Sequence, residues 1–291
     1  MANADFDKIG VIGMGIIGKG IANHLRQNGK DVYVWNRSPK PEPNFLGSPG
    51  EMAQLVKVIQ IYVTDGDALL SIMGQLKGSL TSHHIILNHS TVEPHASVAA
   101  HEIAQSVGAD FLDAPFTGSK EAAKAGALVY YIGGDPGVLE QVKPVLELSA
   151  KEIIYIGKVG EASVIKIATN MISAATVEVL SEAYGLTKAA GIDPQVLQHA
   201  IENNACNSVL ASMKLPTMIE GNFEPHFSLK NMFKDSKFAL ELGKQFAVDM
   251  PVLTTTANIM FRTMQKGRGD DDYSVLAANY QSDKHLPDSR S

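Results

Sequence analysis

A glycine-rich loop is the first feature of the sequence that could do chemistry. It follows a short apolar run of β-branched residues and consists of Gly13, Met14, Gly15, Ile16, Ile17 and Gly18. In such a loop the first glycine permits a tight turn, the second lets a pyrophosphate approach the backbone, and the third lets helix and strand pack closely. A helix that begins here offers free N–H groups and a partial positive charge to phosphate. A turn of this kind can be purely structural, but its place at the first strand–helix junction favours dinucleotide binding.

The residues after the second expected strand indicate which dinucleotide would bind. A site for NAD places Asp or Glu near the end of this strand to hold the ribose 2′-hydroxyl. The sequence instead has Asn36, 18 residues after Gly18. Arg37 can pair with a 2′-phosphate, and Ser38 can donate a hydrogen bond to it. Arg37 could also be a solvated loop residue, but together with the glycine loop this pattern favours NADP(H).

A polar stripe on an apolar helix is the second candidate for chemistry. The segment from Ala162 to Ala190 reads as one long helix, and Ser163, Lys166, Asn170 and Ser173 share one of its faces. A helix that is apolar nearly all round is buried in the protein or in an interface. The stripe could be the solvated side of the helix, but such a side would normally carry more than one charge. In a cleft, the lysine could donate a proton to a developing alkoxide, and the asparagine could orient the ammonium or a substrate hydroxyl.

Strands and helices alternate through the first half of the chain and would position these groups. Expected strands are Lys8–Ile12, Asp31–Trp35, Val58–Val63, Ile85–Asn88, Phe111–Ala114, Val129–Ile132 and Ile153–Ile156. Helical patterns separate most of them, for example Ile16–Gln27, Glu93–Val107 and Asp135–Leu148. The alternation predicts right-handed βαβ units in an α/β, doubly wound, mostly parallel sheet. Three prolines between positions 39 and 43 predict that the helix after the second strand is shortened or lost.

After Gly157 the pattern is helical, with no convincing strand. We therefore expect two domains, over residues 1–158 and 159–291, with the domain boundary near Gly157–Gly160. The second domain would be all-α and joined to the first by the long helix. The tail after about residue 281 is polar, and we expect it to fray.

Composition and charge exclude several classes of protein. The 291 residues include 25 Lys and Arg and 31 Asp and Glu, so the net charge of −6 argues against a generally basic nucleic-acid binder. One cysteine, Cys206, rules out a disulfide framework and a Cys-paired zinc site, and no histidine lies in an HExxH pattern, so we expect no metal. There is no apolar run of about 18 residues. With a polar start that lacks a signal-peptide pattern, this predicts a cytoplasmic protein without a membrane span.

Five further motifs complete a recognisable series. They are Ser90-Thr91 with Pro94, the segment 113–119 (DAPFTGS), Gly160 with Lys166 and Asn170, Phe227 with Lys234-Asp235, and 267–270 (GRGD) with Asp272 and Ser274. Together with the glycine loop and residues 36–38, they occur in the order and at the spacing of the β-hydroxyacid dehydrogenase family, which the chain resembles over nearly its whole length. This family includes 3-hydroxyisobutyrate dehydrogenases and glyoxylate/succinic semialdehyde reductases. The resemblance implies an N-terminal Rossmann domain, a helical C-terminal domain and a homo-oligomer, either dimer or tetramer.

The resemblance also implies roles for single residues. Lys166 would be the general acid in reduction and the base in oxidation, while Asn170 would position the substrate. Thr117 and Gly118 would bind the substrate carboxylate, and Thr91 would contact the nicotinamide ribose or the substrate. Other residues placed at the substrate are Ser119, Phe227 and Asp235, and Lys234 is placed at the cofactor. Alternatives stay open: Asp113 could merely shape a turn, Asp235 could tie helices together, and Lys230 could be solvated.

The departures from the family pattern bear on the substrate. Thr117 stands where Ser is usual, Ser119 replaces a second glycine, and Ser119-Lys120 resembles the glyoxylate/semialdehyde subgroup. His89 occupies a position next to the Ser-Thr loop where an acidic or apolar residue is common. We expect NADPH-dependent hydride transfer to a small carboxylate-bearing aldehyde or keto acid, or the reverse from a 3-hydroxy acid (EC 1.1.1.-). The alternatives are a 3-hydroxyisobutyrate-type dehydrogenase, an imine reductase-like enzyme and a non-catalytic NADP-binding module. Imine reductases commonly lack the catalytic lysine, so Lys166 favours carbonyl chemistry.

Overall fold

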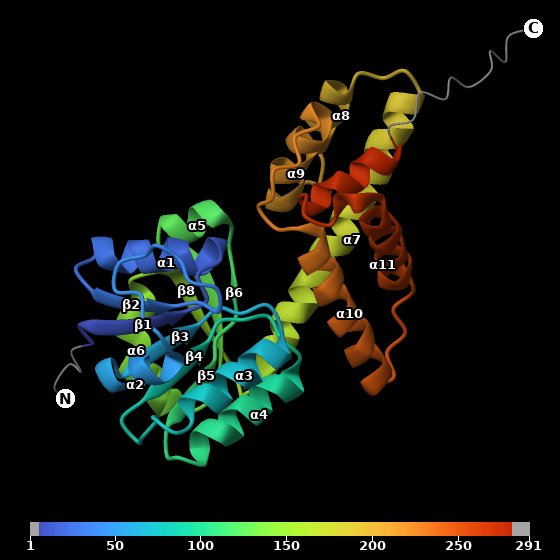
Figure 1. Ribbon diagram of the computed structural model, residues 1–291. Helices are drawn as coiled ribbons and strands as arrows, with labels where there is room; N and C mark the ends of the chain where they lie inside the picture. The colour runs from blue at the N-terminus through green and yellow to red at the C-terminus, as the bar shows by residue number, and fades with distance from the viewer. Residues whose placement is uncertain (1–5, 281–291) are drawn as a thin grey trace, which may run out of the picture. The chain divides into compact units, whose positions relative to one another are not determined.

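The short apolar runs of the first half form a single sheet in the computed structural model, which describes residues 6–280 (Figure 1). The strands are β1 (Lys8–Ile12), β2 (Asp31–Trp35), β3 (Val58–Ile61), β4 (Ile85–Asn88), β5 (Asp110–Asp113), β6 (Phe116–Thr117), β7 (Leu128–Gly133) and β8 (Ala150–Gly157). Their order is β2-β1-β3-β4-β5-β7-β6, with β8 paired to β7. The first five are parallel, whereas β7 runs antiparallel to β5 and β6. The expected α/β, mostly parallel sheet is confirmed.

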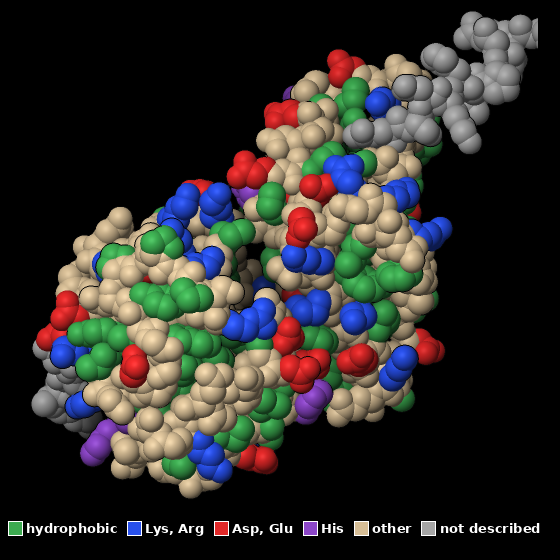
Figure 2. All heavy atoms as spheres, in the orientation of Figure 1, with side chains coloured by type: hydrophobic (Ala, Val, Ile, Leu, Met, Phe, Trp, Pro, Cys, Tyr) green, Lys and Arg blue, Asp and Glu red, His purple; other side chains and the backbone are tan. Residues whose placement is uncertain are grey.

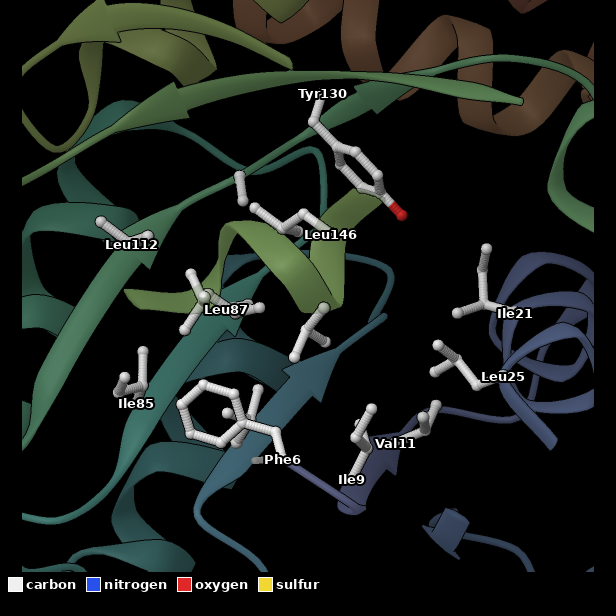
Figure 3. Packing of buried hydrophobic residues seen from close by; sticks show 14 of the residues in the cluster. Phe6, Ile9, Val11, Ile21, Leu25, Ile85, Leu87, Leu112, Tyr130 and Leu146 are labelled. Carbon is white, nitrogen blue, oxygen red and sulfur yellow. The ribbon is translucent and has the colours of Figure 1, made fainter. Parts of the chain in front are cut away.

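Helices cover both faces of this sheet. They are α1 (Ile16–Gln27), α2 (Pro49–Leu55), α3 (Gly66–Leu76), α4 (Pro94–Gln105), α5 (Lys120–Lys124) and α6 (Pro136–Glu147). Alternating side chains of β1 enter two cores: Ile9 and Val11 pack with α1 and α6, while Ile12 packs with α2, α3 and α4. Figure 3 shows Ile9 and Val11 near Leu25 of α1 in the first of these cores. Both faces are thus buried, as in doubly wound sheets.

The proline-rich segment between β2 and α2 is tied to α1 and to β2. The carboxylate of Glu42 lies 2.7 Å from Nζ of Lys19 and 3.8 Å from a guanidinium nitrogen of Arg26. Further along, Phe45 forms an isolated parallel bridge with Val34 of β2. As predicted from the prolines, the helix after the second strand is short, since α2 has only seven residues.

The described part of the chain beyond residue 157 contains helices and no strand. These helices are α7 (Glu161–Ala189), α8 (Pro194–Glu202), α9 (Val209–Glu220), α10 (Leu229–Gln245), α11 (Pro251–Thr263), the π-helical turn η1 (Met264–Arg268) and the 3-10 helix η2 (Tyr273–Tyr280). A buried ion pair closes this bundle: Lys214 of α9 contacts both oxygens of Asp272 at 2.7 and 2.9 Å. Asp272 also accepts N–H groups from His226 and Phe227, so it ties the start of η2 to the segment before α10.

The chain divides into two compact units, Met1–Lys166 and Ile167–Ser291, and the division falls within α7. On the face of the second unit shown in Figure 2, acidic and basic side chains are intermingled. The polar tail after about residue 281 lies outside the described residues. By length and composition α7 could cross a membrane, but 44% of its most apolar window is buried in the protein, and core helices pass the same test.

Candidate active site

The glycine loop has the shape of a phosphate cradle. Gly13 has a φ of +97°, and a Cβ atom there would lie 1.9 Å from the carbonyl oxygen of Tyr62. A Cβ on Gly18 would lie 1.9 Å from the carbonyl oxygen of Gly13. A Cβ on Gly15, by contrast, would meet no atom within 4 Å. The first and third glycines are therefore required by close packing, while the second leaves open space that a pyrophosphate can fill, so the loop fits a dinucleotide.

Helix α1 starts directly behind this loop. Gly15 is its N-cap, and no side chain caps the helix, so its first-turn N–H groups can meet phosphate oxygens. Met14 is buried, Ile17 is half-buried and Ile16 is exposed.

Asn36 braces the glycine loop. Its Oδ1 accepts a hydrogen bond from the backbone N–H of Met14 at 3.0 Å, and its Nδ2 donates to the carbonyl oxygen of Ser38 at 2.8 Å. One side chain thus joins the loop after β1 to the turn after β2. Arg37 and Ser38 are exposed, and within residues 6–280 the Arg37 guanidinium forms no hydrogen bond or ion pair. It is therefore available to an anion.

The loops after β3 and β4 are also joined. Ser90 accepts the backbone N–H of Val63 on its hydroxyl at 2.9 Å. Thr91 follows and is half-buried. Because β1, β3 and β4 are parallel, the segments after them lie along one edge of the sheet, the carboxyl edge where doubly wound folds bind their ligands.

The segment 117–119 runs from β6 into α5. Thr117 is the last residue of β6, and Gly118 follows it. Gly118 has a φ of +147° and a hypothetical Cβ only 2.5 Å from Leu128 Cδ2, which favours glycine. The Ser119 hydroxyl caps α5 by accepting the N–H of Ala122 at 3.2 Å. Its oxygen therefore has a structural task, while its O–H can still donate.

Asp113 connects the end of β5 to the start of α7. Its buried carboxylate accepts the hydroxyls of Ser97 and Ser163 and the backbone N–H groups of Gly160 and Ser163, all within 3.1 Å. Burial raises the pKa of Asp113, and these hydrogen bonds oppose the rise. The hypothesis that Asp113 merely shapes a turn is therefore wrong: it holds the helix that carries Lys166 three residues later.

The polar stripe of α7 is largely buried. Ser163 is fully buried, and Lys166 and Asn170 are each 8% exposed, so the stripe is not the solvated side of the helix. Ser173 is half-buried and donates to the carbonyl oxygen of Thr169 in its own helix. Lys166 is thus shielded from water on a helix of few charges, and a side chain held in this way can transfer a proton to a bound group.

Asn170 and Asp235 meet in the second unit. Nδ2 of Asn170 donates to Oδ2 of Asp235 at 2.6 Å, and Lys234 places its Nζ 3.1 Å from Oδ1 of the same carboxylate. The Lys234 ammonium also lies over the ring of Phe238, 4.9 Å from its centre. Asp235 therefore ties α7 to α10, the alternative left open for it, and it does so through a residue of the polar stripe.

The other two expectations for this unit concern Phe227 and Lys230. The Phe227 ring packs edge-on against the ring of Tyr273, with ring centres 6.2 Å apart. Tyr273 directly follows Asp272 of the buried Lys214–Asp272 ion pair. Lys230 is exposed and forms an ion pair with Asp270, which confirms that it is a surface residue. Within residues 6–280, no group of three His, Cys, Asp or Glu side chains is placed to hold a metal ion.

Sequence reasoning missed the role of two polar side chains of the first unit. Ser97 links Asp113 to Asn88, whose Nδ2 donates to its hydroxyl at 3.3 Å. His89 is buried directly after β4. Ser97 could have been noticed as a polar residue among the alanines of the expected helix, and His89 as a histidine that follows an apolar run closely.

Comparison with known proteins agrees with this geometry. Residues 8–157 match the NAD-binding domain of 6-phosphogluconate dehydrogenase, and residues 160–280 match the family described as NAD-binding of NADP-dependent 3-hydroxyisobutyrate dehydrogenase. Glyoxylate/succinic semialdehyde reductase 2, chloroplastic, of Arabidopsis thaliana is 30% identical over 279 residues, which cover 92% of this chain and 78% of that protein. The cytokine-like nuclear factor N-PAC of Mus musculus is 27% identical over 278 residues, which cover 94% of this chain and 51% of that protein.

Solved structures support the fold. The 3-hydroxyisobutyrate dehydrogenase of Mycobacterium tuberculosis, solved with L-serine, superimposes with a TM-score of 0.86 at 22% identity and covers 96% of this chain and 100% of that one. At this identity the likeness extends to the fold alone.

Proposed function

This chain belongs to the β-hydroxyacid dehydrogenase family, and from that premise we propose that it is an NADPH-dependent reductase of small carboxylate-bearing aldehydes or keto acids. The family membership makes it a nicotinamide-dependent oxidoreductase that acts on hydroxyl and carbonyl groups. The choice of NADPH, the substrate class and the residue roles are our proposal.

The buried lysine of α7 is the observation that carries the proposal. The cofactor, when bound, supplies the hydride. As negative charge grows on the carbonyl oxygen, Nζ of Lys166 donates a proton to it, and a positioned acid of this kind contributes about 10²–10⁴-fold to the rate. Asn170, whose amide is oriented by Asp235, positions the substrate oxygen. In oxidation the same lysine accepts the proton.

Substrate and cofactor contacts fall on the loops of the first unit. The hydroxyl of Thr117 and the backbone N–H of Gly118 bind the substrate carboxylate, and Thr91 contacts the nicotinamide ribose or the substrate. Gly13–Gly18 bind the pyrophosphate, while Arg37 and Ser38 bind the 2′-phosphate. The free guanidinium of Arg37 supports this assignment. Ser119 is a further proposed substrate contact of the first unit. For the second unit we propose Phe227 as a substrate contact and Lys234 as a cofactor contact.

The relatives support a glyoxylate or semialdehyde substrate over the alternatives. The reductase from Arabidopsis thaliana acts, by its name, on glyoxylate and succinic semialdehyde, and Ser119-Lys120 agrees with that subgroup. A non-catalytic module is the second candidate, because a nuclear factor is also among the relatives. The buried Lys166 and the Asn170–Asp235 hydrogen bond favour the enzyme, since a binding module needs neither.

A panel of NADPH-oxidation assays tests the proposal. We expect turnover of glyoxylate or succinic semialdehyde above that of 3-hydroxyisobutyrate with NADP⁺ or of cyclic imines with NADPH. Lys166→Met should lower kcat by about 10²–10⁴-fold while NADPH still binds, as followed by cofactor fluorescence. Lys188→Met, an exposed lysine of the same helix, is the matched control and should act as wild type. NADPH binding without turnover of any substrate would favour the module instead.

A further inference from the structure

His89 lies in a cluster of four aromatic rings at the carboxyl edge of the sheet. Its ring, 1% exposed, stacks on Tyr62 with centres 4.8 Å apart and planes at 22°, and it lies 5.0 Å from the ring of Tyr130. Phe116 completes the cluster at 6.2 Å from Tyr62 and 6.3 Å from Tyr130. The four rings therefore form a closed set of contacts, and His89 is its one member with a hydrogen bond to a loop backbone.

The two ring nitrogens of His89 are in different situations. Nδ1 lies 2.7 Å from the carbonyl oxygen of Ala114. Because a carbonyl oxygen can only accept, Nδ1 carries the proton of the neutral ring. Nε2 is buried and has no hydrogen-bond partner within residues 6–280. Burial lowers the pKa of His89 to about 4, so the imidazole is neutral near pH 7.

The hydrogen bond from His89 continues the sheet beyond its last regular rung. β4 and β5 pair as far as Asn88 and Asp113, and the last ladder bond runs from the N–H of Ala114 to the carbonyl oxygen of Asn88 at 2.8 Å. One residue later the two strands diverge into loops. There the Nδ1–H of the imidazole, in place of a backbone N–H, donates to the carbonyl oxygen of Ala114.

Three of the four rings adjoin loops of the proposed site. Tyr62 packs its backbone against Gly13 of the glycine loop. His89 is followed by Ser90 and Thr91. Phe116 is followed by Thr117, the first residue of the proposed carboxylate-binding loop. The cluster thus joins the cofactor loop to both substrate loops.

We propose that His89 is a positioning residue, which fixes the carboxylate-binding loop at Thr117–Gly118 through its hydrogen bond to Ala114. The inference rests on the proposed function and deepens it. A phenylalanine would fill the same space without leaving a buried nitrogen unpaired, so ring packing alone does not account for a histidine here. The donor at Nδ1 is what the histidine adds.

Two variants separate the donor from the ring. His89→Phe keeps a ring against Tyr62 and removes the donor, whereas His89→Asn keeps a donor close to the position of Nδ1 and removes the ring. We expect His89→Phe to raise KM for glyoxylate or succinic semialdehyde and to lower kcat/KM by about 10- to 100-fold, because small misplacements of a bound substrate cost that much. NADPH affinity should not change. His89→Asn should keep most of the wild-type kcat/KM.

His84 offers a matched control. It is a buried histidine directly before β4, where His89 is directly after it, and its Nε2 lies 2.7 Å from the carbonyl oxygen of Ala53. It thus lies at the amino end of the strand, away from the ligand edge. His84→Phe should lower the melting temperature but leave kcat/KM of the folded enzyme unchanged. An equal loss in both histidine variants would mean a merely structural role and would overturn the inference.

The other possible results also test the role of His89. If His89→Asn is as impaired as His89→Phe, the ring and not the donor is responsible, and the inference is wrong. Should His89→Phe not fold, His89→Gln replaces it, because its amide reaches past the position of Nδ1 and cannot restore the bond to Ala114. An active wild type with unimpaired His89 variants overturns this inference alone. A wild type without turnover of any carbonyl substrate overturns the proposed function and this inference together.

Discussion

Asp113 anchors the first turn of the helix that carries Lys166. The backbone N–H groups of Gly160 and Ser163 both donate to one of its carboxylate oxygens, at 3.1 and 3.0 Å. First-turn N–H groups have no partner within their own helix, and a negative charge at this end is favoured by the helix dipole. Asp113, which lies 53 positions before the lysine, thus caps α7 and fixes the position of the helix start that carries Lys166.

Asp113→Asn should weaken both the fold and the reaction. Its amide can present at most one acceptor oxygen to the donors that now share the carboxylate. Hydrogen bonds to charged groups are worth about 1.5–3 kcal/mol each, so we expect a loss of about 2 kcal/mol in the free energy of unfolding, measured with urea. kcat should fall with it. Ser97→Ala removes one hydroxyl and leaves the capping contacts, so it should lower the free energy of unfolding and kcat by less than Asp113→Asn does. An equal effect of the two variants would contradict the capping role.

Asn170 and Asp235 should be coupled in a double-mutant cycle. The 2.6 Å hydrogen bond between them is buried, and replacing either partner by alanine removes it. We expect a coupling of about 1–2 kcal/mol between Asn170→Ala and Asp235→Ala, in kcat/KM as well as in urea unfolding. The exposed Lys230–Asp270 pair is the control, because neither side chain is placed at the substrate or the cofactor and no coupling in kcat/KM is expected. Additive effects of Asn170→Ala and Asp235→Ala on kcat/KM would contradict a shared role.

Arg37→Ala should change the choice of cofactor. Its exposed guanidinium is free to pair with a 2′-phosphate, and a charge-assisted bond of this kind is worth about 1.5–3 kcal/mol. We therefore expect kcat/KM for NADPH to fall about 10- to 100-fold and that for NADH to stay the same. Lys30→Ala, a cation at the other end of β2, should leave the ratio unchanged. An unchanged ratio in Arg37→Ala would remove the basis for NADPH preference.

The regular elements of the first unit could be predicted from the sequence because their signals are local. Strands β1, β2 and β4 and helix α1 begin and end where the apolar pattern and the glycines indicate. Strand β6 was missed, because two residues are too few to show any alternation. The antiparallel direction of β7 also leaves no local trace. Strand direction is set by which neighbours pair, and that is a property of the whole sheet.

The site was predicted in part for the same reason. Residue types at helical spacing identified Lys166 and Asn170, and burial confirms that their face is not solvated. The partners of these residues were not predictable. Asp113 meets Ser163 across 50 positions, and Asn170 meets Asp235 across 65. A contact at such separation follows from packing of the folded chain and has no pattern in the sequence around either residue.

Acid should destabilise the protein through His89. Its folded pKa of about 4 is below the value of about 6.5 in an unfolded chain, so between these values the unfolded state binds a proton that the folded state does not. Stability is therefore full above about pH 6.5 and falls as the pH drops toward 4, by up to about 3 kcal/mol. Tyr62 and Tyr130, which pack on the ring, have raised pKa values and stay neutral here.

Urea unfolding of wild type and His89→Phe between pH 7 and 4.5 measures this contribution. The variant should lose less stability over that range, even if it is less stable at pH 7. Parallel pH profiles for the two proteins would show that His89 does not carry the acid sensitivity.

The exposed face of α7 should mediate self-association. Four apolar side chains recur at intervals of seven residues on this helix: Ile165, Ile172, Val179 and Leu186, which are 37%, 62%, 58% and 73% exposed. This row of exposed apolar side chains suits a second copy of this chain. We expect a dimer or tetramer by light scattering, and Ile172→Glu with Leu186→Glu should shift it toward monomer. Lys188→Gln lowers the charge of the same helix by one, as each glutamate does, and should not dissociate the oligomer. An oligomer that survives both glutamates would place the interface elsewhere.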